Sequence, residues 1–176
     1  MKTFFVTLAL LLVLAACNTL TGTRRHVDDP RTFLSYAATD KDVKTVIVSH
    51  PALSSRSKLV KHITKNLNDS YRFLRTNFTT SDSSSMVKPY KVVFAFNPQQ
   101  QTASGDICAA PGSLKLAPPS KRLIIVAVFC GDSLITEVTA NVDYAGINKT
   151  ANLNDAIKQL AANLIPQEEP IRSFGE

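Results

Sequence analysis

Short apolar segments with two different periodicities follow one another along the chain and predict mixed α and β structure. Residues 44–48 are β-branched except for Lys44 and end shortly before Pro51, which is typical of a strand. From a cap at Ser54 or Ser55 to about Thr76, apolar side chains recur at helical spacing and predict an amphipathic helix. Its apolar stripe consists of Leu59, Val60, Ile63, Leu67, Tyr71 and Leu74.

Three further strands are predicted in the second half of the chain. A serine- and threonine-rich loop at 79–85 precedes a strand at 90–96. Residues 122–130 are apolar without interruption from Leu123, which is typical of a central strand covered on both faces. After a turn, residues 134–144 alternate between apolar and polar, which predicts a strand with one buried face. That face is expected to carry Leu134, Thr136, Val138, Ala140, Val142 and Tyr144.

The chain closes with a predicted helix and a polar tail. The helix begins after Asn152 or Asn154, either of which is a suitable cap, and ends before Pro166. Its buried positions are Leu153, Ile157, Leu160, Ala161 and Leu164. The order β-α-β-β-β-α predicts an α+β two-layer sandwich, with two helices on one face of a four-stranded, mostly antiparallel sheet. We expect one domain over residues 32–166 and a flexible tail over 167–176.

The N-terminal apolar segment does not fit this domain and has the features of a targeting signal. Lys2 supplies a positive start, and the apolar stretch that follows is too short to span a membrane. It ends in Leu14-Ala15-Ala16-Cys17, which resembles the lipobox of bacterial lipoproteins. The resemblance implies a signal peptide over residues 1–16, cleavage before Cys17, and acylation of its thiol and new amino group. An ordinary secretory signal with an incidental Cys17 is the alternative.

The resemblance also implies a location for the mature protein. An aspartate directly after the cysteine retains enterobacterial lipoproteins at the inner membrane, and this chain has Asn18 there. We therefore expect a lipid anchor in the outer membrane, facing the periplasm, with the inner membrane as the less favoured site. Residues 17–31 are polar and predict a lipidated tether that reaches roughly 20 Å on average.

Two cysteines remain for the folded domain once Cys17 is acylated. In an oxidising compartment Cys108 and Cys130 most simply form a disulfide bond, with two separate thiols as the alternative. Cys108 lies in the connection 99–120, which is rich in proline, alanine and glutamine. Connections of this length without structure are uncommon and are often functional, so the disulfide would attach this one to the core.

Composition and charge narrow the function only slightly. The chain is 44% hydrophobic, has no tryptophan and carries a formal net charge of +6. Removal of residues 1–16 removes only the charge of Lys2 and leaves +5. This composition suits a single soluble domain behind the signal peptide. Nucleic acid is an improbable partner for a protein tethered in the periplasm.

One sequence resembles a catalytic motif but lacks its companions. Gly131-Asp132-Ser133-Leu134 spells the first block of the GDSL esterases, whose serine nucleophile requires a histidine base later in the chain. The three histidines, His26, His50 and His62, all precede Ser133 and share no metal-ligand spacing. We therefore interpret the motif as a hairpin turn, and expect neither a metal site nor a cofactor. Paired carboxylates that meet only in space remain an alternative.

The first predicted helix has six basic residues and one acidic residue, a local net charge of +5 that equals the net charge of the mature chain. At 100° per residue, five cations fall on the side opposite its apolar stripe. They are Lys58, Lys61, Lys65, Arg72 and Arg75. Such a face attracts phosphate-bearing surfaces such as anionic lipid or lipopolysaccharide, or an acidic partner. A solvated helix face with no ligand is the alternative.

Together these features predict a membrane-anchored periplasmic lipoprotein. We expect a non-catalytic binding or assembly factor of the cell envelope whose partner is a protein, a glycan or lipopolysaccharide. The layout resembles, at the level of architecture, small lipoproteins that assist envelope assembly. An envelope hydrolase, GDSL-like or carboxylate-based, is the alternative.

Overall fold

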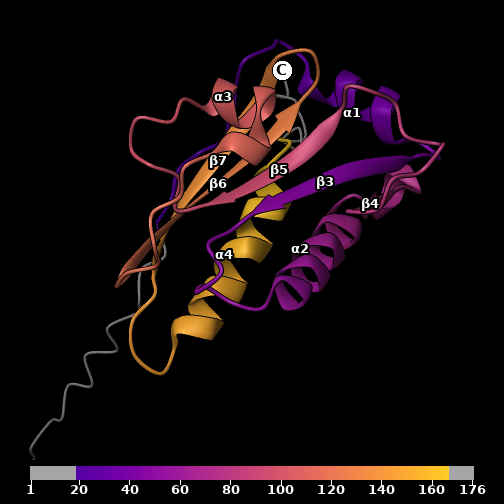
Figure 1. The fold of residues 1–176 in the computed structure, drawn as a ribbon. Helices are drawn as coiled ribbons and strands as arrows, with labels where there is room; N and C mark the ends of the chain where they lie inside the picture. The colour runs from indigo at the N-terminus through magenta and orange to yellow at the C-terminus, as the bar shows by residue number, and fades with distance from the viewer. Residues whose placement is uncertain (1–18, 167–176) are drawn as a thin grey trace, which may run out of the picture.

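The computed structural model describes residues 19–166 as an α+β fold built on one mixed sheet (Figure 1). The strands lie in the order β1-β7-β6-β5-β3-β4, and β2 also pairs with β7. Strand β3 runs parallel to β4 and β5, whereas the other pairs are antiparallel. The expected signal peptide, Cys17 and the expected tail at 167–176 lie outside the described residues.

The elements have the following bounds. The strands are β1 (Thr19–Leu20), β2 (Arg24–Arg25), β3 (Asp42–Val48), β4 (Asn77–Thr79), β5 (Lys91–Phe96), β6 (Arg122–Cys130) and β7 (Leu134–Asp143). The helices are α1 (Pro30–Ala38), α2 (Arg56–Ser70), α3 (Ser104–Ala109) and α4 (Lys149–Asn163), with 3₁₀ turns η1 (Arg72–Leu74) and η2 (Pro111–Ser113). The predicted strands correspond to β3, β5, β6 and β7, and the predicted helices to α2 and α4.

The four-stranded sheet expected from the sequence is too narrow, because β1, β2 and β4 extend it at both edges. Helices α1 and α3 were also not foreseen. The added strands contain two or three residues each, which is too few for an apolar periodicity to show. They form because a neighbouring strand offers unpaired backbone groups, a feature that local sequence does not carry.

The expected tether is a second correction, since much of it belongs to the folded domain. Thr19 lies opposite Asn141 on β7, and Arg24 lies opposite Glu137 on the same strand. Helix α1 begins at Pro30, where the carboxylate of Asp29 accepts hydrogen bonds from two backbone N–H groups of the first turn. The hydrogen bond from the Thr32 hydroxyl contributes most to lowering the pKa of Asp29. The chain is therefore ordered against the sheet from residue 19 onwards.

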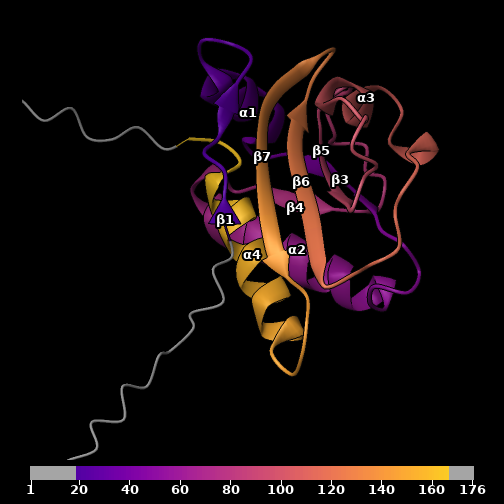
Figure 2. The same ribbon diagram turned by 90° about the vertical axis from the view of Figure 1, so that its left-hand side faces the viewer.

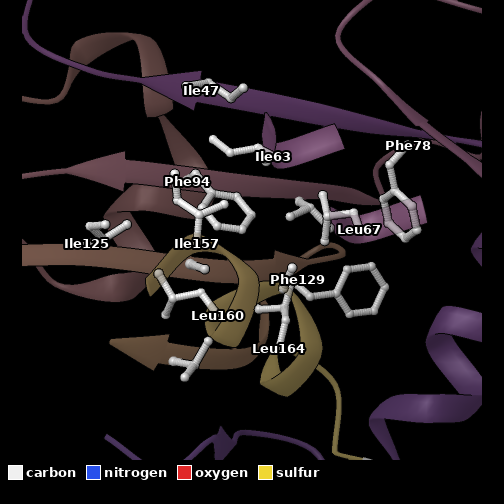
Figure 3. Packing of buried hydrophobic residues seen from close by; sticks show 14 of the residues in the cluster. Ile47, Ile63, Leu67, Phe78, Phe94, Ile125, Phe129, Ile157, Leu160 and Leu164 are labelled. Carbon is white, nitrogen blue, oxygen red and sulfur yellow. The ribbon is translucent and has the colours of Figure 1, made fainter. Parts of the chain in front are cut away.

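Helices α2 and α4 cover one face of the sheet and form the main core with it (Figures 1 and 2). Ile63 and Leu67 of α2 and Ile157 of α4 gather around Phe94 of β5, as Figure 3 shows, and Phe129 of β6 belongs to the same cluster. All five of these side chains are fully buried. The apolar stripe of each helix, with its period of 3.6 residues, thus packs on the apolar side chains that alternate along the strands, as the sequence predicts.

The opposite face of the sheet is covered by the connection that precedes β6. Within that connection, α3 and η2 form and Pro98 bridges to Leu116, so the segment is not structureless. Ile107 of α3 packs on Val128, and the sulfur atoms of Cys108 and Cys130 lie at disulfide-bonding distance. Strand β6 is buried on both faces, which agrees with its uninterrupted apolar sequence.

The alternation predicted for residues 134–144 breaks at the start of β7. Cys130 pairs with Leu134 and Phe129 pairs with Thr136, so Ile135 is an extra residue in the ladder. Leu134 consequently packs on the α3 side, whereas Ile135 joins the core under α2 and α4. A bulge of this kind depends on the neighbouring strand, and residues from Thr136 onwards follow the predicted faces.

The predicted helix ends also shift. Helix α2 ends at Ser70 instead of about Thr76, and Arg75 adopts a left-handed conformation with φ 51° after η1. The buried hydroxyl of Tyr71 accepts a hydrogen bond from the Ile165 backbone N–H at 3.0 Å. Burial raises the pKa of this phenol. Helix α4 begins at Lys149, before either predicted cap.

We expect oxidised protein from the periplasm to have no free thiol at Cys108 or Cys130. In a Cys17→Ser background, alkylation without reductant should leave the intact mass unchanged, and alkylation after reduction should add two groups. Replacing both cysteines with alanine should lower the free energy of unfolding by roughly 3 kcal/mol in a urea titration, because the pair closes a loop of 22 residues. Alkylation of either cysteine before reduction would contradict the bond.

Candidate functional site

A groove lies between the N-terminal parts of α2 and α4 and encloses a volume of about 460 Å³. Apolar side chains of Leu53, Leu59 and Leu153 contribute to its lining, together with Tyr144. Both helices turn their apolar stripes towards the sheet, so the groove between them is lined by the residues that border those stripes. Its cationic lining residues are Lys58, Lys61, Lys65 and Lys149.

Hydrogen bonds at this end of the molecule hold the two walls together. The Tyr144 hydroxyl donates to the backbone carbonyl of Leu53 at 2.6 Å, which joins the end of β7 to the segment before α2. Farther along α2, His62 Nε2 lies 3.2 Å from the carbonyl oxygen of Asn154 on α4. Ser55 caps α2 by accepting from the backbone N–H of Lys58 at 3.4 Å. These contacts join side chains to backbone atoms and use none of the lysine side chains of the groove.

The groove is strongly positive because it has no acidic lining residue among residues 19–166. In that described range neither Lys58 nor Lys61 forms an ion pair, and both are exposed. Lys65 pairs with Asp69 one turn further along α2. Lys149 Nζ lies 5.8 Å from the centroid of the Tyr144 ring. Unpaired cations beside apolar side chains suit an amphiphilic ligand with negative charge.

The five cations predicted for one helix face do not stay together. Helix α2 ends before Arg72 and Arg75, and the guanidinium of Arg75 pairs with Asp40 at 2.6 Å. Lys58, Lys61 and Lys65 do share the groove. The sequence does not predict the fourth cation of the groove, Lys149. Only the packing of α4 against α2 places it in the same groove as the other three lysines, and no periodicity within either helix predicts that packing.

A second hollow is less suited to an anion, although it is also rich in lysine. Its volume is about 410 Å³, and its lining includes Lys44, Lys88 and Lys91 together with Asp82. Lys44 Nζ donates to an Asp82 carboxylate oxygen at 2.6 Å, and that bond lowers the pKa of Asp82. The paired carboxylate offsets part of the positive charge, so the α2–α4 groove is the better candidate.

Ser133 lies exposed in the turn between β6 and β7, as expected for a hairpin. Its backbone carbonyl accepts from the Gly131 N–H at 2.9 Å. Within residues 19–166 no histidine is hydrogen-bonded to Ser133, and His26 instead lies 3.8 Å from Glu137. A Cβ at Gly131 would lie 3.1 Å from the Tyr90 ring and 3.2 Å from Ile135, so a larger residue there would have to displace one of these side chains by a few tenths of an ångström.

No group of three or more histidine, cysteine, aspartate or glutamate side chains in residues 19–166 is placed to hold a metal ion. None of the helices in this part of the chain combines the length and apolar character needed to cross a bilayer. Comparison with protein-family models, curated proteins and solved structures finds no match.

We expect Ser133→Ala to leave both the stability and any ester hydrolysis of the protein unchanged. The hydroxyl is exposed and the turn hydrogen bond uses the backbone, so the change should stay within about 0.5 kcal/mol in urea unfolding. Hydrolysis of p-nitrophenyl esters by wild type and variant is the second measurement. A hydrolytic rate that disappears in a folded Ser133→Ala variant would favour the esterase alternative.

Proposed function

We propose that this protein is a lipid-anchored, non-catalytic binding factor of the bacterial envelope, and that the α2–α4 groove binds its anionic ligand. The observation that carries the proposal is the convergence of four lysines on a groove with apolar lining and no acidic lining residue among residues 19–166. The ligand class that fits is a phosphate-bearing amphiphile, such as a lipid headgroup or lipopolysaccharide. Its phosphates would meet the lysines, and its apolar part would contact the half-buried Tyr144 ring and the edges of the leucine side chains below it.

The strength of such binding follows from ordinary electrostatics. Each lysine close to an anionic membrane surface contributes about 1 kcal/mol, so a few together give useful affinity. Lys65 contributes less than Lys58 or Lys61 because Asp69 already neutralises it. The attraction is screened over a Debye length of about 8 Å at physiological salt, so binding should be salt-dependent.

The proposed location rests on the sequence Leu14-Ala15-Ala16-Cys17 and on Asn18. Acylation of Cys17 anchors the chain stably, because the several acyl chains exceed the two signals that lasting attachment requires. We place the anchor in the outer membrane, with the domain on the periplasmic side. An envelope protein or a glycan is the alternative partner at the same groove.

The alternative function is hydrolysis of an envelope component by Ser133 or by paired carboxylates. The absence of a hydrogen-bonded histidine beside Ser133 in the described range disfavours the first form. Assays of ester hydrolysis and of murein cleavage on purified protein separate the two functions. Turnover by wild type would replace the binding proposal with an enzymatic one.

Cys17→Ser should abolish incorporation of a fatty-acid analogue and leave an unprocessed precursor. The measurement is metabolic labelling of cells that express wild type or variant, followed by purification and detection of the label. A matched Cys130→Ser variant should retain full labelling, because that cysteine lies in the folded domain. Equal labelling of Cys17→Ser and wild type would end the lipoprotein interpretation.

Replacing Lys58, Lys61 and Lys149 with glutamine should weaken binding to vesicles of anionic lipid while the melting temperature is preserved. Loss of three such contacts should cost about 3 kcal/mol at low salt, and the difference should shrink as salt rises. The assay uses Cys17→Ser protein without the signal peptide, so that the anchor does not mask the effect. Co-sedimentation with vesicles is measured at several salt concentrations.

The matched control replaces Lys88, Lys115 and Lys121, which are exposed and do not line the groove. It changes the net charge by the same amount and should bind nearly as wild type does. Equal weakening by the two triple variants would show that only overall charge matters. Equal binding by all three proteins at low salt would reduce the groove to a solvated surface.

A further inference from the structure

Ile147 is the most exposed large apolar residue among residues 19–166, with 97% of its surface accessible. It lies at the tip of the loop between β7 and α4, directly after Gly146. Gly146 has a φ of +64°, a conformation that other residues rarely adopt, and nothing lies within 4 Å of a Cβ built there. The backbone therefore turns sharply at this point and presents an isoleucine to the surroundings without any cover.

The N-terminal segment is directed towards the same end of the molecule. Strand β1 is antiparallel to β7, and Thr19 lies opposite Asn141, near the end of β7 from which this loop leaves. Six residues before Asn141 on β7, the backbone carbonyl of Ile135 accepts a hydrogen bond from the His26 N–H. Thr23 donates to the carbonyl of Asn163, at the far end of α4. Followed from His26 back to Thr19, the chain therefore runs towards the end of the domain that carries Ile147, as the position of β1 in Figure 2 shows.

Only one residue, Asn18, separates Thr19 from the lipobox cysteine. Two steps of extended chain span at most about 7 Å, so an anchor on Cys17 would act within that reach of Thr19. This is much shorter than the reach of the tether expected from the sequence. An acyl chain on Cys17 would therefore bring this end of the domain to the membrane surface.

The exposed isoleucine is close in sequence to a lysine of the α2–α4 groove. Lys149 follows it by two residues at the start of α4, and Lys58 and Lys61 line the groove that Lys149 also lines. Segments that lie in the membrane interface combine apolar side chains with lysines, whose long stems let the charge stay at the surface. The lysines meet headgroup phosphates, and the apolar side chain enters the region of the acyl chains.

From these observations we infer that loop 144–148 inserts Ile147 into the leaflet that holds the Cys17 anchor. The leaflet is anionic, and the lysines of the groove lie at the level of its phosphates. In this orientation the first turns of α2 and α4 face the membrane. The inference rests on the proposed acylation of Cys17, and it adds a fixed orientation and a second point of membrane contact.

The natural absence of tryptophan makes the inference directly measurable, because one substitution adds a unique fluorophore. The full acylated protein is prepared as Ile147→Trp and, as a matched control, as Phe73→Trp. Phe73 is 64% exposed and lines a small cavity with Ile165, beyond the opposite end of α4. Both proteins are reconstituted in vesicles of phosphatidylcholine and phosphatidylglycerol, with and without lipids brominated high on the acyl chain.

The Ile147→Trp protein should show a blue-shifted emission maximum and several-fold stronger quenching by the brominated lipid than Phe73→Trp. Adding Lys58→Gln, Lys61→Gln and Lys149→Gln to Ile147→Trp should reduce the quenching. Equal quenching at both positions would overturn the orientation, and so would quenching at position 73 alone or at neither position.

Two failures are separable in this experiment. Intact mass and flotation of the vesicles report whether the protein is acylated and bound, independently of fluorescence. Acylated, vesicle-bound protein without quenching of Ile147→Trp would overturn the orientation and leave the proposed anchor standing. Protein recovered without acyl chains and without vesicle binding would overturn the proposed anchor and the orientation together.

Discussion

Strand β6 is buried on both faces, and much of the described domain is arranged to cover it. Its odd-numbered side chains, such as Ile125, contact the core under α2 and α4, and its even-numbered ones, such as Val128, contact the layer under α3. Such a strand is fully removed from solvent only when both faces of the sheet are covered by other elements. The attachment of α3 through Cys108 and Cys130 is therefore a consequence of the same constraint.

The covering of the first face also produces the groove. Helices α2 and α4 must turn their leucine and isoleucine side chains to the sheet, so their lysines are confined to the outer surface and to the border between the helices. Contacts such as that from Tyr144 to Leu53 then hold the helix starts at fixed positions. Burying an unpaired lysine in the core would be very unfavourable. The lysines therefore stay at the surface, and several of them line the groove.

The edge of the sheet has a different role, because it decides how far the domain can lie from its proposed anchor. A free tether would let the domain move over a range of roughly 20 Å. Pairing of β1 and β2 with β7, followed by α1, takes up most of that segment, and Thr19, where the pairing begins, is only two positions after Cys17. A few backbone hydrogen bonds at an edge strand thus turn a loosely held domain into one with a preferred side towards the membrane, if the proposed acylation holds.

The sequence by itself determined the features that depend on local order. The uninterrupted apolar run identified β6, the helical stripe that includes Ile63 identified α2, and the only two cysteines beyond Cys17 are the pair that the fold brings together. Such periodicities are visible because each residue is read against its own neighbours in the chain.

Only the tertiary structure decided the features that need two distant segments. Three such features are the pairing of Thr19 with Asn141, the bulge at Ile135, and the placement of Lys149 and Lys58 in one groove. Each depends on which surfaces come together. Arg75, which belonged to the predicted cationic face, is diverted to Asp40 for the same reason. Backbone pairing and side-chain packing are set by geometry across the whole domain, and a pattern within one segment carries no record of the partner it will meet.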